Sequence, residues 1–299
     1  MNNSAKLKLL FIVNPGSGNS KTNWPQEIER HFKPLQHSIE LFALPNPCEP
    51  LILKQKIDDY QPQIAVAVGG DGTVKLVAEC LLQTNIALGI LPAGSANGMA
   101  KELDIPADAQ KAIDVLLNGR IEKISVVRIN KELCIHLSDL GFNAFVIKKF
   151  DSDKGRGMWG YLKASWKVLW QQPQMSLIIQ ADRENVQRQA TMIVIANATR
   201  YGSGAVINPE GRLNDASFEV IIVKKISFTE IFKMMITHKP YDPEKIEIFQ
   251  TRSLEIETPK PAHFQVDGEY LGRVSKVKAT LLPQAISVVT PQTTPPNMA

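Results

Sequence analysis

The sequence has few features of an oxidised, secreted or membrane-spanning protein. Its 3 cysteines, Cys48, Cys80 and Cys134, are widely spaced and lie among apolar residues. No spacing among them fits a metal site, so we expect reduced thiols in the core of a cytosolic protein. The N-terminal run Leu7–Val13 is too short for the core of a signal peptide. No apolar stretch approaches the roughly 18 residues that a membrane span needs.

A strong charge of one sign is also missing. The formal net charge is +4, which is too small to indicate nucleic-acid binding but is compatible with an anionic cosubstrate or an anionic membrane surface. The hydrophobic share of 44% and the charged share of 21% are ordinary for a globular protein. With 299 residues, the chain suits one large or two medium domains.

The most informative stretch is an apolar run, Ile64–Val68, followed by Gly69-Gly70-Asp71-Gly72-Thr73. A helical spacing of apolar residues starts directly afterwards, at Val74, Val77, Ala78 and Leu81. Glycines at such a strand-to-helix turn let backbone N–H groups approach an anion, and the helix N-terminus adds a favourable partial charge. The pattern therefore predicts a phosphate site at this turn.

The first part of the chain alternates strands with helices. The predicted strands span 7–13, 38–43, 64–68 and 86–91, and the predicted helices span 25–33, 51–60, 74–81, a short segment to 103, and 107–117. Ser95 or Asn97 is expected to cap the short helix. This alternation predicts an open, mostly parallel sheet with helices on both faces, which binds ligands beyond the carboxyl ends of its strands. Three polar, glycine-bearing loops, 14–18, 69–73 and 94–98, are expected to converge there.

The pattern changes near Arg120, where short strands separated by turn residues begin. The predicted strands span 121–129 and 133–137, which form a hairpin, and then 176–181, 187–197, 218–223, 245–249, 253–258, 262–266, 274–282 and 285–290. Only Phe228–Thr237 is expected to be helical among the later segments. This arrangement predicts an antiparallel, β-rich second domain, most simply a sandwich.

Several motifs occur in the order typical of one enzyme family. Gly-Gly-Asp-Gly-Thr at 69–73 is similar to the signature of diacylglycerol kinases, long-chain-base kinases and NAD kinases. The other matching segments are Asn14-Pro15-x-Ser17-Gly18, Pro92–Ala100, Gly141–Ala144, Asn197 with Gly202-x-Gly204 and Pro209, Leu213-Asn214-Asp215, and Val266-Asp267-Gly268-Glu269. The set resembles the diacylglycerol-kinase catalytic-domain family of lipid kinases more closely than it resembles NAD kinases.

The resemblance implies a particular domain organisation. A nucleotide-binding α/β domain would span 1–122, with 284–292 returning to it. A β-sandwich domain for the lipid substrate would span 123–283, and residues 293–299 would form a loose tail.

The resemblance also implies how the nucleotide is held. ATP would lie on the loops of the first domain, because phosphoryl transfer depends on amides, hydroxyls and Mg²⁺ that neutralise phosphate charge. The implied nucleotide-binding residues are Asn14, Ser17, Gly18, Gly70, Asp71, Gly72, Thr73, Gly94, Ser95, Asn97 and Glu269. A carboxylate beside a triphosphate would repel it, so Asp71 is predicted to be catalytic as a Mg²⁺ ligand. Its alternative role is to cap the following helix.

Two further acids receive roles from the resemblance. Asp267 is implied to be the general base that takes the proton from the lipid hydroxyl. Glu269, two residues on, is expected to face the same side of an extended segment and to hold a second Mg²⁺ or its water. The alternative is that Asp267 and Gly268 merely form a hairpin turn. Asp215, with the carbonyls of Arg212 and Ser217, is similar to a structural metal site; a plain turn aspartate is the alternative.

The segment 158–170 carries three of the 4 tryptophans and is flanked by lysines and arginines. An aromatic, cationic, amphipathic helix suits a membrane interface or an acyl-chain cleft, so peripheral membrane contact through 154–170 is one interpretation. An ordinary helix packed on the sheet is the other. His136, His238 and His263 lack metal-ligand spacing, and we expect no catalytic role for them.

Together these features predict an ATP- and Mg²⁺-dependent lipid kinase that phosphorylates the hydroxyl of a diacylglycerol-like or long-chain-base lipid. The lipid at the membrane surface would be its partner, met from the cytosolic side, and no nucleic acid is expected. One alternative is a kinase of the NAD-kinase type with a soluble substrate. The other is a catalytically silent nucleotide or lipid sensor, because Leu76 stands where lipid kinases usually have a glutamate.

Overall fold

The computed structural model describes residues 6–17, 22–46, 49–141, 144, 174–182, 185–198, 211–225, 242 and 244–292. The chain forms two compact units: Ser125–Pro283 is one, and the other combines the residues up to Ile124 with those from Gln284 onward. Some predicted features lie outside the described residues: Gly18, Cys48, the segment 154–170, Gly202, Gly204, Pro209, the helix 228–237, His238 and the tail 293–299.

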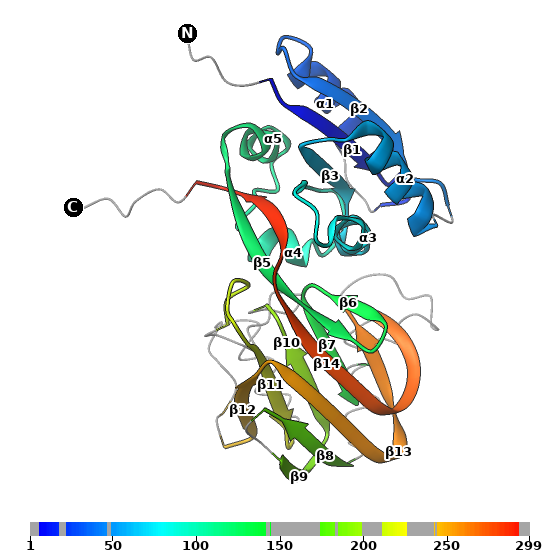
Figure 1. The fold of residues 1–299 in the computed structure, drawn as a ribbon, viewed down its shortest axis with the longest axis vertical. Helices are drawn as coiled ribbons and strands as arrows, with labels where there is room; N and C mark the ends of the chain where they lie inside the picture. The colour runs from blue at the N-terminus through cyan, green and yellow to red at the C-terminus, as the bar shows by residue number, and fades with distance from the viewer. Residues whose placement is uncertain are drawn as a thin grey trace, which may run out of the picture. The chain divides into compact units, whose positions relative to one another are not determined.

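The first unit contains a parallel sheet in the order β2-β1-β3-β4-β14 (Figure 1). Its strands are β1 (Lys8–Val13), β2 (Ser38–Ala43), β3 (Ile64–Gly69), β4 (Ala87–Pro92) and the last part of β14 (Glu269–Thr290). β3 and β4 are buried along their whole length, as their unbroken apolar sequences predict. The sheet therefore needs cover on both faces.

Five helices in the described residues of this unit provide that cover. They are α1 (Trp24–Phe32), α2 (Pro50–Tyr60), α3 (Asp71–Leu81), the short α4 (Gly98–Glu102) and α5 (Ala109–Asn118). α1 packs with α5, and α2 packs with α3, so the long helices form two pairs beside the sheet (Figure 1). On α1 the buried side chains are Trp24, Ile28 and Phe32, which recur at the spacing of one helix face.

The second unit is antiparallel and rich in β-structure. Its strands are the second part of β5 (Arg120–Ile129), then β6 (Glu132–Cys134), β7 (Leu137–Gly141), β8 (Met175–Ala181), β9 (Asn185–Ala190), β10 (Met192–Ala196), β11 (Phe218–Val223), β12 (Ile246–Thr251), β13 (Ser253–Val266) and the first part of β14. One layer has the order β12-β11-β10-β7, continued by the end of β13. In the other layer, the start of β13 pairs with β8 and β14, and β8 pairs with β9.

The core of this second unit combines side chains from both layers, such as Ile193 and Phe218 from one and Ile179 and Leu254 from the other. Fully burying an aliphatic or aromatic side chain of this size contributes about 1.5–3 kcal/mol. The predicted fold class, an α/β domain followed by an antiparallel β-rich domain, is confirmed.

Several predicted strand boundaries are wrong. The predicted strand 187–197 is two strands, β9 and β10, which are separated at Thr191. Conversely, the segments predicted to flank Pro259 and Pro261 form the single strand β13, whose pairing with β14 shifts register between Glu257 and Ala262. Proline lacks a ladder N–H, so it interrupts pairing there without ending the strand.

Two more boundaries differ in the same region. The segments predicted at 274–282 and 285–290 are both part of β14, which passes Pro283 and the left-handed Gln284 (φ +49°) without ending. The predicted strand 133–137 is divided, because β6 ends at Cys134 and β7 begins at Leu137. The two residues between them, Ile135 and His136, form the link between β6 and β7.

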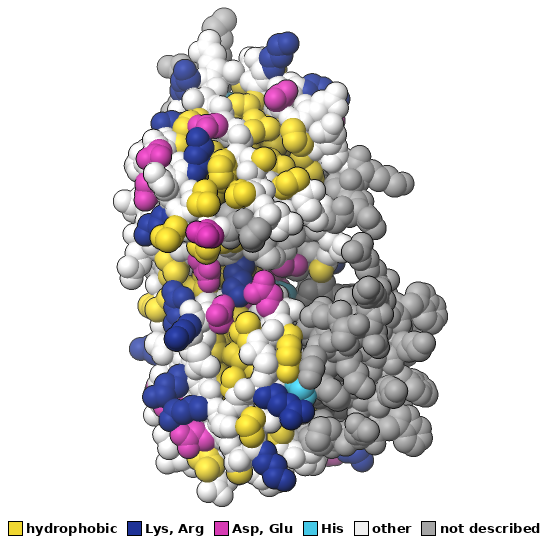
Figure 2. Space-filling model, turned by 90° about the vertical axis from the view of Figure 1, so that its right-hand side faces the viewer, with side chains coloured by type: hydrophobic (Ala, Val, Ile, Leu, Met, Phe, Trp, Pro, Cys, Tyr) yellow, Lys and Arg dark blue, Asp and Glu magenta, His cyan; other side chains and the backbone are white. Residues whose placement is uncertain are grey.

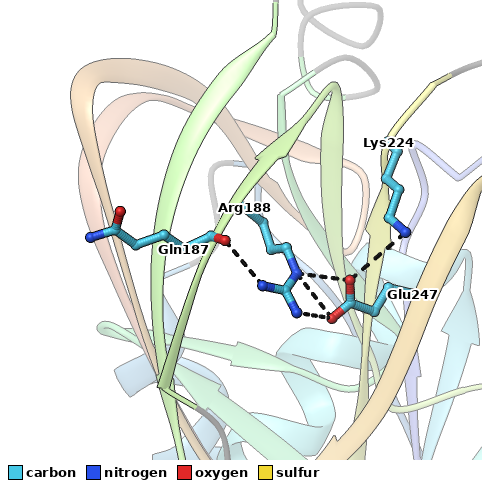
Figure 3. Close-up of polar contacts among 4 residues, drawn as sticks. All are labelled: Gln187, Arg188, Lys224 and Glu247. Carbon is cyan, nitrogen blue, oxygen red and sulfur yellow. Dashed lines mark hydrogen bonds and ion pairs between the residues drawn. The ribbon is translucent and has the colours of Figure 1, made fainter.

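An ion pair joins the outer strands β9 and β12 (Figure 3). The Arg188 guanidinium donates from Nε and Nη2 to the two carboxylate oxygens of Glu247, both at 2.8 Å, and Lys224 Nζ lies 4.0 Å from the same carboxylate. The Arg188 hydrogen bond holds the pKa of Glu247 below its ordinary value. These strands are therefore bridged by side chains instead of a backbone ladder.

Charges of both signs are mixed on the surface, and Lys and Arg side chains lie near Asp and Glu on the face in Figure 2. Between β13 and β14, Lys276 pairs with Glu255 and Glu257, and Lys278 pairs with Glu255. Glu255 raises the pKa of Lys276, and Lys276 in turn lowers the pKa of Glu255. No helix among the described residues is both long and apolar enough to cross a membrane.

Candidate active site

Three loops of the first unit meet at one edge of its parallel sheet. β1, β3 and β4 run in the same direction and end at Val13, Gly69 and Pro92, so the loops that follow them leave the sheet together. We call residues 14–17, 69–73 and 93–98 the three-loop edge. The predicted convergence of these loops is present in the structure, and the contacts between them show how it is built.

Asn14 connects the first loop to the second. Its side-chain Nδ2 donates to Thr73 Oγ1 at 3.0 Å, and its backbone N–H donates to the Val68 carbonyl at 3.1 Å. Thr73 is buried and packs against Gly69, where an added Cβ would lie 2.3 Å from Thr73 Oγ1. Ser17 Oγ donates to the Asn14 carbonyl at 2.7 Å. Asn14 and Thr73, both predicted to bind nucleotide, thus use their side chains to hold the two loops together.

Two glycines bring the second and third loops into backbone contact. An added Cβ on Gly94 would lie 2.4 Å from the Gly70 Cα, a distance that real structures do not tolerate. The Ala93 N–H also donates to the Gly69 carbonyl at 3.0 Å. Only residues without side chains allow these backbones to approach so closely.

Asp71 fastens the same two loops with its carboxylate. Oδ2 accepts a hydrogen bond from the Gly98 N–H at 3.0 Å, and Oδ1 accepts one from the Met99 N–H at 2.9 Å. These are the first two residues of α4, so Asp71 caps that helix from outside, whereas its own helix α3 begins after Gly70 without a side-chain cap. The partial positive charge of the α4 N-terminus stabilises the carboxylate.

The predicted capping of the short helix by Ser95 or Asn97 is therefore wrong in its details. Asn97 does occupy the N-cap position, but it is left-handed (φ +49°) and its side chain turns back to Gly94. Its Oδ1 accepts from the Gly94 N–H and its Nδ2 donates to the Gly94 carbonyl, both at 2.8 Å. Ser95 is exposed. Asp71 reaches the helix amides because the glycine contact brings the two loops together.

Gly72 is an open position of the three-loop edge. It is exposed in the first turn of α3, and an added Cβ there would meet no atom within 4 Å. The first bond in α3 is donated by Thr73 N to the Gly70 carbonyl, so the N–H groups before it have no acceptor within the helix. An exposed helix N-terminus beside a glycine is where an anionic group can approach the backbone.

A second cluster of polar groups lies in the second unit, around the turn between β13 and β14. The Asp267 carboxylate accepts three backbone N–H groups: from Ile135 to Oδ2 at 3.0 Å, and from His136 and Leu137 to Oδ1 at 2.9 and 3.1 Å. Cys134 Sγ lies 3.5 Å from Oδ1 as a further donor. These donors are the link residues Ile135 and His136 and the strand residues on either side of them, so Asp267 holds the link in place.

The geometry of this turn also determines where Glu269 lies relative to Asp267. Asp267 and Gly268 are both left-handed, with φ of +49° and +86°, and they reverse the chain. The predicted alternation of Asp267 and Glu269 along one extended face is therefore wrong, because a reversing turn separates them. Glu269 is exposed at the first position of β14.

Two buried polar side chains that the sequence analysis missed support the turn. Gln265 Oε1 accepts the Gly268 N–H at 2.8 Å, and Gln265 Nε2 donates to Asp139 Oδ2. Asp139 Oδ1 accepts from the Ala144 N–H at 2.8 Å, and both side chains are about 1% exposed. The available signal was a polar residue within an apolar strand, at Asp139 in β7 and at Gln265 in β13.

The predicted structural metal site is a closed turn. The Asp215 N–H donates to the Arg212 carbonyl at 3.0 Å, and the Arg212 N–H donates to Asp215 Oδ2 at 3.2 Å. Ser125 Oγ donates to the Asp215 carbonyl at 2.9 Å, which ties the turn to β5. Ser217 lies directly before β11 and is half-buried.

The carboxylates available near the three-loop edge suit a Mg²⁺ ion that a nucleotide brings with it better than a Mg²⁺ ion that the protein holds alone. The described part of the chain contains no group of three His, Cys, Asp or Glu side chains that could hold a metal ion. Both oxygens of Asp71 already accept N–H groups. Mg²⁺ typically uses one or two carboxylates together with substrate phosphates and water, and Asp71 can supply one such ligand.

Cys80 and Cys134 are buried and form no disulfide, in agreement with the expectation of reduced thiols. Cys134 has the additional position beside Asp267.

Both units match models of known protein families. The model of the diacylglycerol kinase catalytic domain matches residues 8–129, and the model of the YegS C-terminal NAD kinase β-sandwich-like domain matches residues 139–290. Over 247 residues the chain is 29% identical to an uncharacterised protein of Synechocystis sp., covering 79% of this chain and 57% of that protein. It is 26% identical over 235 residues to a diacylglycerol kinase of Staphylococcus saprophyticus, covering 76% and 77% of the two chains.

Solved structures share the fold. A Bacillus anthracis chain described as a diacylglycerol kinase superposes with a TM-score of 0.70 at 18% identity, covering 95% of this chain and 97% of that one. An NAD kinase from Archaeoglobus fulgidus in complex with ATP gives a TM-score of 0.54 at 14% identity, covering 95% and 94%. The two matched domain models account for most of the sequence in the expected order. The chain therefore belongs to the diacylglycerol kinase catalytic-domain family of lipid kinases, with a C-terminal domain of the YegS type.

Proposed function

We propose that this protein transfers the γ-phosphoryl group of ATP to the hydroxyl of a diacylglycerol-like or long-chain-base lipid, and that it requires Mg²⁺. The observation that carries the proposal is the open backbone at Gly72, at the N-terminus of α3 within the three-loop edge. Family membership supplies the reaction class.

The triphosphate is proposed to lie along the three-loop edge. Asn14 and Thr73 fix the first two loops, and Gly70 with Gly94 fixes the last two. The chain's own contribution would be rigid, correctly placed amides, since phosphoryl transfer depends mainly on positioning and charge stabilisation. Gly18 and Ser95 are proposed as further contacts of the nucleotide loops. When bound, Mg²⁺ would neutralise phosphate charge, with Asp71 as its candidate ligand in the first unit. Glu269, in the second unit, is proposed to hold a second Mg²⁺ or its water.

The lipid hydroxyl is proposed to approach the Asp267 turn of the second unit. Asp267 was predicted as the general base, and that role remains part of the proposal. Its carboxylate already accepts three N–H groups, so it also organises the link that carries Ile135 and His136. The turn at Arg212, Asp215 and Ser217 is proposed as a structural cation site, because carbonyl and carboxylate oxygens are the ligands that Mg²⁺ and Ca²⁺ prefer.

A single methyl group can test the nucleotide site. We expect Gly72→Ala to leave the fold intact, because the added Cβ has open space and alanine is about 0.5–1 kcal/mol better than glycine within a helix. The same methyl group would block an anion from the α3 amides. The experiment measures transfer of radiolabelled phosphate from Mg-ATP into a mixed lipid extract, with binding of a fluorescent ATP analogue and thermal melting in parallel.

The expected result is a labelled lipid with the wild-type protein and a KM for ATP raised about tenfold or more in Gly72→Ala, without a loss of melting temperature. A variant that is stable and binds ATP normally would contradict the proposed nucleotide position. If wild-type protein labels no lipid, NAD is the next acceptor to test, because NAD kinases share this fold. Nucleotide binding without transfer to lipid or NAD would indicate the silent-sensor alternative.

A further inference from the structure

The hairpin of β13 and β14 carries a cluster of polar side chains, His263, Tyr270 and Arg273, that the proposed function does not use. The Tyr270 hydroxyl oxygen lies 2.7 Å from His263 Nδ1. On the other side of the ring, Arg273 donates to His263 Nε2 from Nε at 3.3 Å and from Nη2 at 3.2 Å. One imidazole therefore joins a phenol to a guanidinium, and all three groups belong to the second unit.

A β-bulge brings these side chains onto one face of the hairpin. His263 pairs with Arg273 across the two strands. The next pair is Gln265 with Tyr270, so β14 has one residue more than β13 between the two pairs. Gly272, one of these intervening residues, is left-handed with φ +94°, which glycine adopts without strain. In a regular strand, Tyr270 and Arg273 would point to opposite faces, so the bulge is what places both beside His263.

The chemistry of arginine fixes where the proton of the imidazole lies. A guanidinium can only donate hydrogen bonds, so His263 Nε2 must accept and cannot carry a proton. The ring is therefore neutral and has its proton on Nδ1, which donates to the Tyr270 oxygen. Tyr270 thus holds the ring in the tautomer that can orient Arg273, in the way that an outer partner fixes a metal-bound histidine.

Arg273 keeps its full charge in this arrangement. Lys276 and Lys278, on the same strand, form ion pairs with Glu255. Arg273 is exposed and, among the residues that the structure describes, forms no ion pair with an acidic side chain. A carboxylate would offset the charge of the guanidinium, whereas a neutral imidazole orients it without doing so. Arginine held in this way is suited to bidentate binding of phosphate oxygens.

The acid nearest to this cluster in sequence, Glu269, belongs to the opposite face of the hairpin. Glu269 pairs with Val266, whose side chain lies in the core of the second unit. Successive residues of a strand point to opposite faces, so Tyr270 and its partner Gln265 face away from that core. The face that carries Arg273 therefore has a positive charge that Glu269 does not offset.

We propose that Arg273, with His263 and Tyr270 as positioning residues, binds a phosphate group on this face of the second unit. The guanidinium would donate to two phosphate oxygens. The phosphate group is carried either by a lipid headgroup or by a small soluble molecule, since both present the same oxygens. The inference stands on the β13–β14 hairpin alone and gives His263 no catalytic role.

The tautomer of His263 is the first test, because a merely structural role would not require it. Wild-type protein labelled with ¹⁵N only at its 5 histidines is measured above about pH 8, where histidine rings are neutral, and His263→Gln identifies the signals of His263. We expect the proton on Nδ1 in the wild type and a shift of the proton toward Nε2 in Tyr270→Phe. A wild-type ring with its proton on Nε2 would overturn the proposal.

The second test compares the binding of phosphate groups by full-length wild type, Arg273→Gln and Lys278→Gln. Each variant removes one exposed cation from β14, and Lys278 is the matched control because it is already paired with Glu255. One arm titrates inorganic phosphate against chloride at constant ionic strength and follows the His263 Nε2 resonance. The other arm measures sedimentation with phosphatidylcholine vesicles that contain or lack phosphatidylglycerol.

We expect the apparent affinity to fall about tenfold or more in Arg273→Gln in at least one arm, with Lys278→Gln close to wild type. Both variants should melt like the wild type, because surface substitutions rarely change stability. A loss confined to the phosphate arm would assign the site to a soluble ligand, and a loss in the vesicle arm would assign it to a lipid headgroup. If Arg273→Gln binds like the wild type in both arms, or Lys278→Gln loses as much, the proposed site is wrong.

Discussion

The two units each contain an aspartate that was predicted to be catalytic, and comparing the two shows how differently one residue type can work. Asp71 follows a parallel strand and accepts two amides from the N-terminus of a helix. Asp267 lies between antiparallel strands and accepts the amides of Ile135 and His136, which link β6 to β7, and of Leu137, the first residue of β7. In both units a carboxylate ties a glycine-bearing turn to a distant segment.

The two aspartates differ in how easily their amide partners find another hydrogen-bond acceptor when the aspartate is removed. The N–H groups at the start of a helix can donate to water or to another capping side chain, so the amides that donate to Asp71 can find a different acceptor. Ile135 and His136 belong to no helix or strand, and the amides of residues 135–137 all donate to Asp267. The second unit should therefore depend more strongly on its aspartate than the first.

The largest effect is expected for Asp267→Ala. The substitution leaves three backbone N–H groups without their acceptor and places a non-glycine residue lacking a polar side chain at φ +49°. Each buried N–H left unsatisfied costs about 1–3 kcal/mol, so we expect about 3 kcal/mol or more to be lost. Urea denaturation measures the loss, and hydrogen exchange should increase at the amides of 135–137. Asp267→Asn, which keeps one acceptor and tolerates this φ, should lose less. Equal losses in both variants would contradict the role of the carboxylate.

The second-largest effect is expected for Gly94→Ala, which disturbs the three-loop edge of the first unit by steric overlap. Its Cβ would lie 2.4 Å from the backbone of Gly70, so one loop has to move, at a cost of about 1–3 kcal/mol. Gly72→Ala, in open space, is the matched control. Thermal melting and ATP binding should both suffer in Gly94→Ala, but only ATP binding in Gly72→Ala. A fully stable Gly94→Ala would show that the contact between the loops is not as close as described.

Asp71→Ala tests the weaker of the two aspartates directly. Removing a cap from a helix N-terminus costs about 0.5–2 kcal/mol, so we expect a loss near 1 kcal/mol, clearly smaller than for Asp267→Ala. Hydrogen exchange should increase at Gly98 and Met99 and remain unchanged at 135–137. The comparison fails if this variant is destabilised as much as Asp267→Ala.

The smallest effect is expected for Glu247→Gln, which removes the carboxylate that pairs with Arg188. Arg188 lowers the pKa of Glu247 from its ordinary value of 4.5, so the pair stabilises the fold fully above that value and loses its effect as the pH falls through the lowered pKa. Both side chains are partly exposed, so the contribution is about 0.5–1 kcal/mol at neutral pH. The free energies of unfolding of wild type and Glu247→Gln should therefore differ at neutral pH and converge as the pH falls through the lowered pKa of Glu247. A difference that grows in acid would contradict this sign.

The sequence alone predicted those helices and strands that depend on a local pattern of apolar residues or glycines. The fully apolar β3 and the helical spacing of α1 predicted the observed boundaries within one residue, whereas the helix predicted from Val74 begins three residues earlier, at Asp71. The motifs also placed polar residues at the correct ends of strands.

What the sequence could not provide were interactions between distant segments. That Asp71 caps α4, 27 residues away, depends on the approach of Gly70 to Gly94, which no local spacing encodes. Similarly, Asp267 accepts hydrogen bonds from Ile135, His136 and Leu137, which lie 132, 131 and 130 positions earlier in the sequence. Proline positions were misleading because β13 and β14 continue past them with a changed register or a single left-handed residue.

The course of β14 has a consequence for how the chain folds. Ser287 and Val288 pair with β4, so the last strand of the first unit's sheet comes from residues synthesised after the entire second unit. During synthesis, β4 therefore keeps an open edge while the second unit can already complete most of its layers. The sheet of the first unit is thus completed only after the second unit has been synthesised. Open strand edges promote aggregation, so this edge of β4 is vulnerable until Ser287 and Val288 have paired with it.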